Sequence, residues 1–354
     1  NSLNYMPLSD NEVSGSKGVS VLMANSLMFQ RTPDPIEGYD DPQLSNFYGE
    51  ALPFLKRGVP LNLLHIENVS YPATWKDTKV LLMSYSNLKP LDKEAHSHIA
   101  KWVKEGGVIV YSSRDIDPFH SVQEWWNQGE YQYKRASDHL FQLLGIGENP
   151  QEGEYTCGKG TVFIIRKDPK EFVLSKDGDH EYVDIVQKLY EEKAKAGPLI
   201  FKNNFYLERG PYVMIAVMDE SINTEPFTIT GLFLDLFDPE LPVLTEKTVS
   251  PGDQAFLFNI EHIKNTTKPQ ILASASRSYD EIIAGKSYSF VAKSPLNTTN
   301  VTRVLLPSRL KSAVFTDFAG NPIPEATWAW DDKSQTCLLK FENNPDGVKV
   351  LLEW

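Results

Sequence analysis

The sequence predicts two folded domains of different class, an α/β domain with a doubly wound parallel sheet followed by an antiparallel β-sandwich. Residues 78–115 read as strand, helix, strand, which is the unit that builds a parallel sheet. From about residue 205 onward, short apolar runs alternate with Pro, Gly, Asn and Asp, and no helical period is sustained. That pattern is typical of antiparallel sheets. At 354 residues the chain is also long for a single domain.

The unit within residues 78–115 sets the parallel arrangement. Residues 80–84 form a short apolar run of the kind a fully buried strand needs. Asp92 is a suitable N-cap for the helix that follows, and Gly106 and Gly107 are suited to end it. Residues 108–111 then form a second buried strand. A connection of this kind is a right-handed crossover between parallel strands.

Upstream, the chain shows the same alternation. Residues 18–23 form a strand, apolar residues at helical spacing follow at 44–55, and residues 59–66 form another strand. Pro53 is expected to kink or shorten the intervening helix. About four parallel strands with alternating helices predict a flavodoxin-type sheet.

The rest of the first domain is less regular. We expect a short helix at 138–144, ended by Gly145, then a strand at 160–166 and an amphipathic helix at 181–195. The change of pattern near residue 205 marks the domain boundary.

The expected organisation has three parts. Residues 1–17 form a linker or the start of a fragment, because they carry neither an initiator Met nor a signal-peptide pattern. Residues 18–204 form the flavodoxin-like domain, and residues 205–354 form the β-sandwich.

Composition and cysteine spacing argue against several classes of partner and site. The net charge of −12 and the pI near 5.1 argue against nucleic acid as a partner, because there is no basic stripe to neutralise phosphates. No apolar run approaches the roughly 20 residues of a membrane span, so no membrane association is expected. Cys157 and Cys337 lie too far apart in the sequence to suggest a disulfide framework or a metal-ligand pair.

Polar residues follow the predicted parallel strands, at the edge where ligands bind in open sheets. Their hydroxyl, amide and carboxylate groups would suit the hydroxyls of a sugar, while an indole stacks on the apolar face of the ring. The alternative is that loops at strand ends are polar in any case and that the tryptophans are core. The candidates are Arg31, Ser86, Asn87, Arg114, Asp115, Asp117 and His120, flanked by Trp125 and Trp126.

Two acids in this group raise the question of catalysis. Asp115 and Asp117 could act as the paired carboxylates of a glycoside hydrolase. Residues two apart in one loop rarely flank a scissile bond, so solvated or capping acids are the favoured interpretation. Together with His120 they show no recognisable metal-ligand spacing, and no metal is predicted.

Nucleophile and cofactor motifs are missing from the sequence. Cys157 precedes a strand and does not occupy a tight strand-to-helix turn. Ser112 and Ser113 lack a G-x-S-x-G context, and the glycines form neither G-x-G-x-x-G nor a P-loop. No cofactor is expected.

Three tryptophans lie on predicted strands of the sandwich, namely Trp328, Trp330 and Trp354. If exposed, they would form a carbohydrate platform, and if buried, they would be packing residues. The sequence leaves both interpretations open.

The first domain resembles a known family. The segments LPFLKRGVPLNLLHIEN, VLLMSYSNLKPLD and IAKWVKEGGVIVYSSRD resemble the class I glutamine-amidotransferase-like domain that follows the catalytic barrel in β-galactosidases, where it is called the trimerisation domain. The later segments DPFHSVQEWW, HLFQLLG, PGDQAFLFNI and ILASASR look like the tail of large bacterial glycoside-hydrolase-like proteins.

This resemblance implies a restricted role. In the family the two catalytic glutamates belong to the barrel. The amidotransferase-like domain of the family has lost its Cys-His-Glu machinery, and the presence of Ser112 and Ser113 at the turn of this chain is consistent with that loss. The family role is subunit assembly, which implies a homo-oligomer and an upstream catalytic barrel as partners. Proteins that act on polysaccharide are often exported, so the resemblance implies an extracellular or periplasmic location.

Three hypotheses follow from the sequence. The leading one is a non-catalytic accessory region of a carbohydrate-active protein, used for assembly and for glycan contact. The second is a stand-alone glycoside hydrolase acting through Asp115, Asp117 or His120. The third is a purely structural interaction module.

Overall fold

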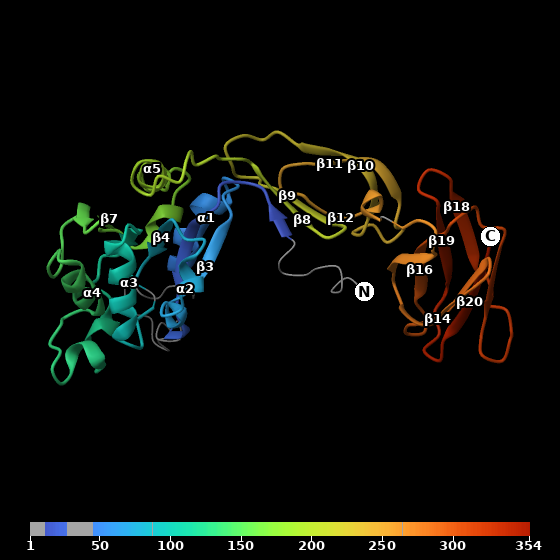
Figure 1. The fold of residues 1–354 in the computed structure, drawn as a ribbon, viewed down its shortest axis with the longest axis horizontal. Helices are drawn as coiled ribbons and strands as arrows, with labels where there is room; N and C mark the ends of the chain where they lie inside the picture. The colour runs from blue at the N-terminus through green and yellow to red at the C-terminus, as the bar shows by residue number, and fades with distance from the viewer. Residues whose placement is uncertain (1–10, 27–44, 87, 264) are drawn as a thin grey trace. The chain divides into compact units, whose positions relative to one another are not determined.

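The computed structural model describes residues 11–26, 45–86, 88–263 and 265–354. Contacts divide the chain into two compact units. The α/β unit consists of Ser14–Phe205 and Glu220–Asn223. The β unit consists of Tyr206–Asp219 and Thr224–Trp354 together with the described residues 11–13. Figure 1 labels many of the helices and strands of both units.

A six-stranded sheet, counted over the described residues, forms the centre of the α/β unit. Its order is β3 (Leu61–His65), β2 (Val19–Met23), β4 (Val80–Met83), β5 (Val108–Ser112), β7 (Gly160–Ile165) and β6 (Gly153–Cys157). All neighbours pair parallel except β6, which is antiparallel to β7. β4 and β5 are buried along their whole length, as uninterrupted apolar strands require.

Helices cover both faces of this sheet (Figure 1). α3 (Glu94–Lys104) and α4 (Ala136–Leu144) contribute to one core. α1 (Ser45–Leu55) and α5 (His180–Lys188), which continues into the π-helical turn η7 (Leu189–Lys193), contribute to the other. The short helical segments are η3 (Ile66–Asn68), α2 (Pro72–Trp75), η4 (Pro118–Ser121), η5 (Trp125–Asn127) and η6 (Pro169–Val173).

Three local features of the α/β unit differ from expectation. The edge strand β6 is not predicted, because its five residues are short and exposed at alternate positions. The N-cap of α3 is Lys93, although the Asp92 carboxylate still accepts the N–H of Glu94 at 3.0 Å. Pro53 is accommodated inside α1, which ends two residues later at Leu55.

The β unit begins with a six-stranded antiparallel sheet, again counted over the described residues. Its order is β1 (Asn11–Val13), β8 (Asn204–Arg209), β9 (Tyr212–Val217), β12 (Gln254–Asn259), β10 (Phe227–Asp235) and β11 (Val243–Val249). Residues 11–13, expected to be part of a linker, therefore form a strand that pairs with β8. A segment of three residues is too short to show a strand period in sequence.

Two four-stranded antiparallel sheets follow and pack face to face. Their shared core contains Tyr288, Phe290 and Val350 from one sheet and Val304 and Leu339 from the other. One sheet consists of β13 (Gln270–Ser274), β16 (Thr299–Leu305), β19 (Thr336–Glu342) and β18 (Thr327–Asp331). The other consists of β14 (Arg277–Ala284), β15 (Ser287–Lys293), β20 (Val348–Glu353) and β17 (Ser312–Thr316), and the short helix η8 (Ile260–His262) follows β12. The expected sandwich is thus preceded by an additional sheet.

A pair of histidines lies between α3 and α4. The Nδ1 atoms of His96 and His139 are 3.0 Å apart, and His96 Nε2 lies 2.7 Å from the hydroxyl of Tyr85. Only one proton fits between two Nδ1 atoms, so this contact requires at least one neutral ring. Burial, reinforced by His139, lowers the pKa of His96 well below its usual value. Burial and the nearby Lys93 also lower the pKa of His139, against a smaller opposing effect of Glu94.

We expect the free energy of unfolding to decrease as the pH falls below 6.5, the ordinary value for histidine. Because the folded-state pKa values are lowered, the unfolded chain takes up protons that the folded pair resists, so this stability is present above that pH and lost below it. His139→Gln should make the unfolding midpoint in urea less dependent on pH between neutral and mildly acidic buffers. His98→Gln, on the same helix as His96 but outside the histidine pair, is the control and should keep the parent dependence. Equal pH dependence in the parent and His139→Gln would contradict this account.

Candidate functional site

Polar residues follow three neighbouring strands of the parallel sheet. Residues 84–86 follow β4, residues 113–117 follow β5, and residues 166–168 follow β7. Because β4, β5 and β7 are adjacent and parallel, their carboxyl ends lie side by side. The structure therefore brings Ser86 and Asp117 to the same edge, and it adds Asp168, which the sequence did not single out.

Two serines and one aspartate form a chain of hydrogen bonds at this edge. The hydroxyl of Ser86 lies 2.8 Å from that of Ser113 and donates to Asp168 Oδ1 at 2.5 Å. The backbone N–H of Arg114 donates to the same carboxylate oxygen at 3.2 Å. All three side chains of the network are buried, and neither serine hydroxyl has a histidine partner among the described contacts. This arrangement is not that of an activated serine nucleophile.

Asp115 is held from both sides of its carboxylate. Tyr111 donates its hydroxyl to Oδ1 at 2.6 Å, and Arg166 Nη1 donates to Oδ2 at 2.8 Å. The Asp115 N–H donates to Ser113 Oγ at 2.9 Å, and Arg135 Nε donates to the Asp115 carbonyl at 3.0 Å. With φ at 54°, Asp115 occupies the left-handed region, which aspartate tolerates better than most residues. The dense contacts hold this turn in place.

Asp117 belongs to a buried ion pair. Its Oδ2 lies 2.9 Å from Lys89 Nζ, and both side chains are only 2% exposed. Its Oδ1 accepts the N–H of Phe119 at 3.1 Å and so caps η4. Burial by itself would raise the pKa of Asp117, but His120 and Lys89 outweigh it and hold that pKa below its usual value. The carboxylate is thus stabilised in its charged form.

His120 lies beside both acids without a well-formed hydrogen bond. Its Nε2 is 2.9 Å from Asp117 Oδ2 and 3.9 Å from Asp115 Oδ1. The shorter contact lacks the angle of a hydrogen bond, and both ring nitrogens have no hydrogen-bond partner among the described residues. The ring fills the space beside the two carboxylates.

An open depression of about 580 Å³ lies next to these acids. Several polar groups on its lining are already engaged within the protein. Asn127 Nδ2 donates to the carbonyls of His120 and Val122, and Ser121 Oγ donates to Pro118. The lining residues are Asp115, Ile116, Asp117, Pro118, His120, Ser121, Asn127, Tyr133, Lys134 and Arg135.

The two flanking tryptophans are part of the interior. Trp126 is 1% exposed and donates its indole N–H to the His120 carbonyl at 3.0 Å, so the expectation that it would stack on a sugar is wrong for this structure. Trp125 is half-buried, donates to the Pro90 carbonyl at 2.8 Å, and packs edge-on against the histidine pair. Trp126 belongs to the core between α3, α4 and η5, and Trp125 packs against that core.

The remaining candidates do not converge on one ligand site. Arg114 points outward and pairs with Glu171 at 2.6 Å. Arg31 and Asn87 lie outside the described residues. In the β unit, Trp354 is buried and Trp330 packs against the sandwich core, whereas Trp328 is exposed, so the three do not form a common platform.

The cysteines have the properties of core residues. Burial raises the pKa of Cys157 despite the nearby Lys104, and burial raises the pKa of Cys337 to about 12. A thiol of high pKa is a poor nucleophile. The described part of the chain contains no group of three or more His, Cys, Asp or Glu side chains arranged to hold a metal ion.

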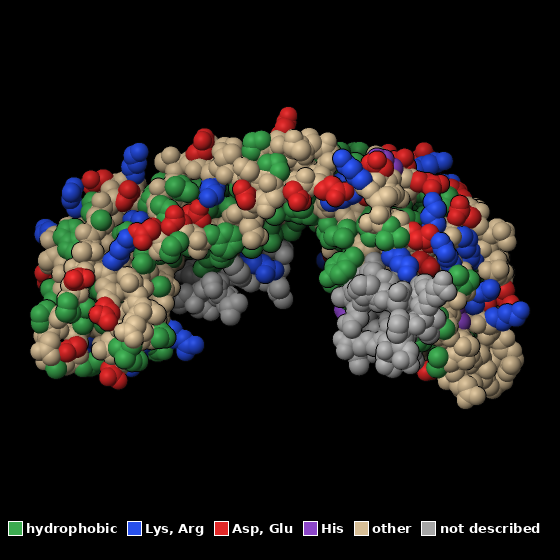
Figure 2. Space-filling view, turned by 180° about the vertical axis from the view of Figure 1, so that it is seen from behind, with side chains coloured by type: hydrophobic (Ala, Val, Ile, Leu, Met, Phe, Trp, Pro, Cys, Tyr) green, Lys and Arg blue, Asp and Glu red, His purple; other side chains and the backbone are tan. Residues whose placement is uncertain are grey.

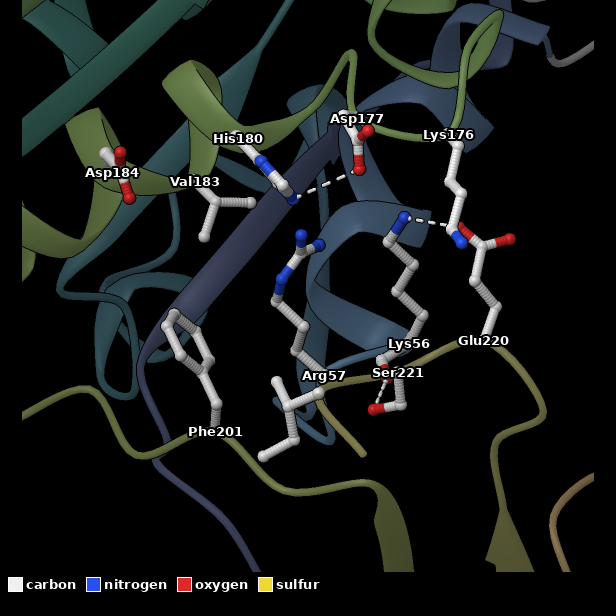
Figure 3. A pocket seen from close by; sticks show the side chains of 11 residues that line it. Lys56, Arg57, Lys176, Asp177, His180, Val183, Asp184, Phe201, Glu220 and Ser221 are labelled. Atoms are coloured by element: carbon white, nitrogen blue, oxygen red, sulfur yellow. Dashed lines mark hydrogen bonds and ion pairs between the residues drawn. The ribbon is translucent and has the colours of Figure 1, made fainter. Parts of the chain in front are cut away.

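A second cavity, of about 390 Å³, lies at the C-terminal end of α1 (Figure 3). Arg57 makes two contacts with Asp179, at 2.8 and 3.1 Å, and Lys56 contacts both Asp179 and Glu220 at 2.8 Å. Burial would raise the pKa of Asp179, but Arg57 and Lys56 hold it below its usual value. The ion pair between Lys56 and Glu220 ties the segment Glu220–Asn223 to the rest of the α/β unit.

Sequence reasoning missed the partners of the predicted acids. Arg166 is the last residue of a predicted strand and Asp168 follows it, so the same carboxyl-end rule could have included both. Tyr111 and Lys89 gave no such signal, because one reads as a strand residue and the other as an exposed loop lysine. Only the structure shows that both side chains are buried against carboxylates.

On the face seen in Figure 2, acidic and basic side chains are interspersed. None of the described helices is both long enough and apolar enough to cross a lipid bilayer.

No model of a known protein family matches the chain, and a search of curated proteins finds no match. Among solved structures, a GH42 β-galactosidase from G. stearothermophilus is similar with a TM-score of 0.41 and 13% identity, over 69% of this chain and 40% of that one. A β-galactosidase from Bacillus circulans sp. alkalophilus gives a TM-score of 0.39 and 12% identity, over 70% and 42%. A rhamnosidase from Novosphingobium gives a TM-score of 0.32 and 10% identity, over 96% and 39%. The chain spans about 40% of the length of the first of these proteins.

We expect Asp117→Ala to lower the free energy of unfolding by about 3–5 kcal/mol, because it leaves the Lys89 ammonium buried without its partner. Urea unfolding would measure the change. Asp177→Ala removes an exposed acid that faces only the exposed His180, and it should cost less than about 1 kcal/mol. Replacing both buried partners, Lys89→Met with Asp117→Leu, should recover part of the loss. Equal effects of Asp117→Ala and Asp177→Ala would contradict a buried ion pair.

Proposed function

We propose that this chain is a non-catalytic accessory region of a glycoside-hydrolase-like, carbohydrate-active protein, serving in assembly and in glycan contact. The observation that carries the proposal is the state of the strand-end acids. The carboxylate of Asp115 accepts hydrogen bonds from Tyr111 and Arg166, and the carboxylate of Asp117 pairs with Lys89. Glycoside hydrolysis needs one carboxyl group that donates a proton and a second that attacks or activates water, both in reach of the sugar. Two buried acids held by cations do not meet that need.

The fold supports this proposal. Numbered along the chain, the five parallel strands run in the order second, first, third, fourth, fifth, which is the flavodoxin-type order. The left-handed residue in the turn after β5 is Asp115, preceded by the buried Ser112 and Ser113, and no cysteine lies in this turn. These features favour an amidotransferase-like domain that has lost its nucleophile.

Exposed apolar residues support the assembly role. Tyr48 and Leu52 lie one helical turn apart on the exposed side of α1, and Leu63 is 56% exposed on the edge strand β3. An exposed sheet edge with apolar side chains is a surface that other chains can cover. The proposal therefore includes a homo-oligomer and an upstream catalytic barrel as partners, in an extracellular or periplasmic setting.

The purified chain should not hydrolyse aryl glycosides or neutral and acidic oligosaccharides, because the strand-end acids are bound within the protein. Product release would be followed for the parent, for Asp117→Asn and for the exposed control Asp177→Asn. Turnover in the parent and in Asp177→Asn that disappears in Asp117→Asn would establish the stand-alone hydrolase instead.

We expect the chain to form a defined oligomer in solution, measured by light scattering after size exclusion. Leu63→Lys should shift it toward the monomer, because a charge on the exposed edge opposes burial of that edge. Leu296→Lys, an exposed position in the β unit, is the control and should leave the mass unchanged. A monomeric parent, or equal behaviour of the two variants, would remove this edge as the assembly surface.

A further inference from the structure

A third cavity, of about 510 Å³, lies within the β unit. It opens where β9, β10 and β12 of the six-stranded sheet meet β13 and β14. A buried cluster joins the two sheets, with Leu234 and Phe258 from one and, from the other, Leu272 of β13 and Leu305 of β16. Arg303 Nη2 adds a buried hydrogen bond to the Leu241 carbonyl at 2.7 Å. The cavity walls are therefore held together by packing, and its volume lies within the usual range for small-molecule sites.

Aromatic rings form one wall of this cavity. Tyr212 and Phe256 stack at 5.5 Å between ring centroids with an interplanar angle of 23°. Phe237 approaches Phe256 at 5.9 Å and is itself exposed. Both Tyr212 and Phe256 line the cavity. Such rings offer an apolar surface on which a ligand with a flat, partly apolar face can stack. A pyranose ring has a face of this kind.

Hydroxyl groups also line this cavity. Ser274, Ser276 and Ser278 all line the cavity, along the chain that crosses from β13 to β14. Ser274 Oγ lies 3.1 Å from Ser276 Oγ and 2.7 Å from Thr302 Oγ1. Ser274 Oγ also accepts the N–H of Ser276 at 3.2 Å, so the one donor and two acceptor positions of its hydroxyl are in use. The hydroxyls of Ser276 and Ser278 keep hydrogen-bonding capacity for a ligand.

Among the described residues that line this cavity, Arg277 is the one permanent cation and none is an acid. Arg277 is exposed at its rim, next to Tyr279, and the ammonium of Lys293 lies 5.7 Å from the centroid of the Tyr279 ring. Lining residues of the other two cavities include aspartates, whereas none of the residues lining this one is Asp or Glu. In a chain of net charge −12, such a lining favours an anionic ligand.

We propose that this cavity binds an acidic saccharide, meaning a sugar unit that carries a carboxylate or a sulfate. The Tyr212–Phe256 wall contacts the apolar face of the sugar ring, and the serine hydroxyls bond its hydroxyl groups. Arg277 pairs with the acidic group, because a guanidinium matches the two oxygens of a carboxylate or sulfate. This inference rests on the glycan contact of the proposed function and assigns it a site and a ligand class.

Titration calorimetry on the full chain would test it, with a galacturonate trisaccharide, a sulfated galactose disaccharide and neutral galactotriose as probes. At least one acidic probe should bind, and the neutral probe should bind more weakly. Arg277→Gln should weaken binding of the acidic probe by about tenfold or more, since it removes the charged partner. Arg309→Gln, an exposed arginine that faces Asp332 elsewhere in the β unit, is the matched control and should bind as the parent does.

Binding of only the galacturonate or only the sulfated probe would support the site and identify the acidic group. No binding of either acidic probe, equal binding of galactotriose, or unchanged binding in Arg277→Gln would overturn the proposal. Both variants alter exposed side chains, and matching thermal unfolding would show that they fold as the parent does. If no acidic probe binds, the saccharide site is overturned, and the expected absence of hydrolysis still stands. If a bound probe is hydrolysed and the hydrolysis depends on Asp117, the non-catalytic accessory role is overturned and the saccharide site still stands.

Discussion

The α/β unit depends on pairing the charges that its parallel sheet buries. Three strands end side by side, and the residues that follow them carry carboxylates into a region with little water. A buried carboxylate is costly unless cations and hydrogen-bond donors surround it. Lys89 for Asp117, and Arg166 with Tyr111 for Asp115, supply those partners. The turn geometry at Asp115 and the cap of η4 depend on these contacts.

The same pairing argues against catalysis at this edge. A general acid needs a carboxyl group whose pKa is raised, whereas His120 and Lys89 hold the pKa of Asp117 low in spite of its burial. The hydroxyl of Ser86 bonds both Ser113 and Asp168, and the thiols of Cys157 and Cys337 are buried. This pairing agrees with the non-catalytic role that we propose. The interpretation of Asp115 and Asp117 as capping or solvated acids was therefore partly right for Asp117, which caps η4 but is not solvated.

The three cavities differ in the kind of ligand they suit. In the cavity at the end of α1, Lys56 and Arg57 pair with Asp179 and Glu220, and in the depression at the strand ends Asn127 and Ser121 donate to backbone carbonyls. The cavity of the β unit combines stacked rings, serine hydroxyls and one arginine. A saccharide presents the matching groups, because its ring has apolar faces and its edge carries hydroxyls. The proposed glycan site therefore lies in the β unit and does not include the strand-end candidates that the sequence singled out.

The sequence by itself determined the class of each part. Uninterrupted apolar runs at residues 80–83 and 108–111 indicate strands buried on both faces, and helical spacing between them indicates a crossover. Such patterns depend on local periodicity, which a single sequence contains. Tertiary structure alone decided which polar residues are free. Lys89 and Trp126 look like surface residues or ligand contacts in sequence, and both are buried because distant segments close over them. The cavity between Tyr212, Phe256 and Arg277 likewise joins strands that are far apart in the chain, so no local pattern could reveal it.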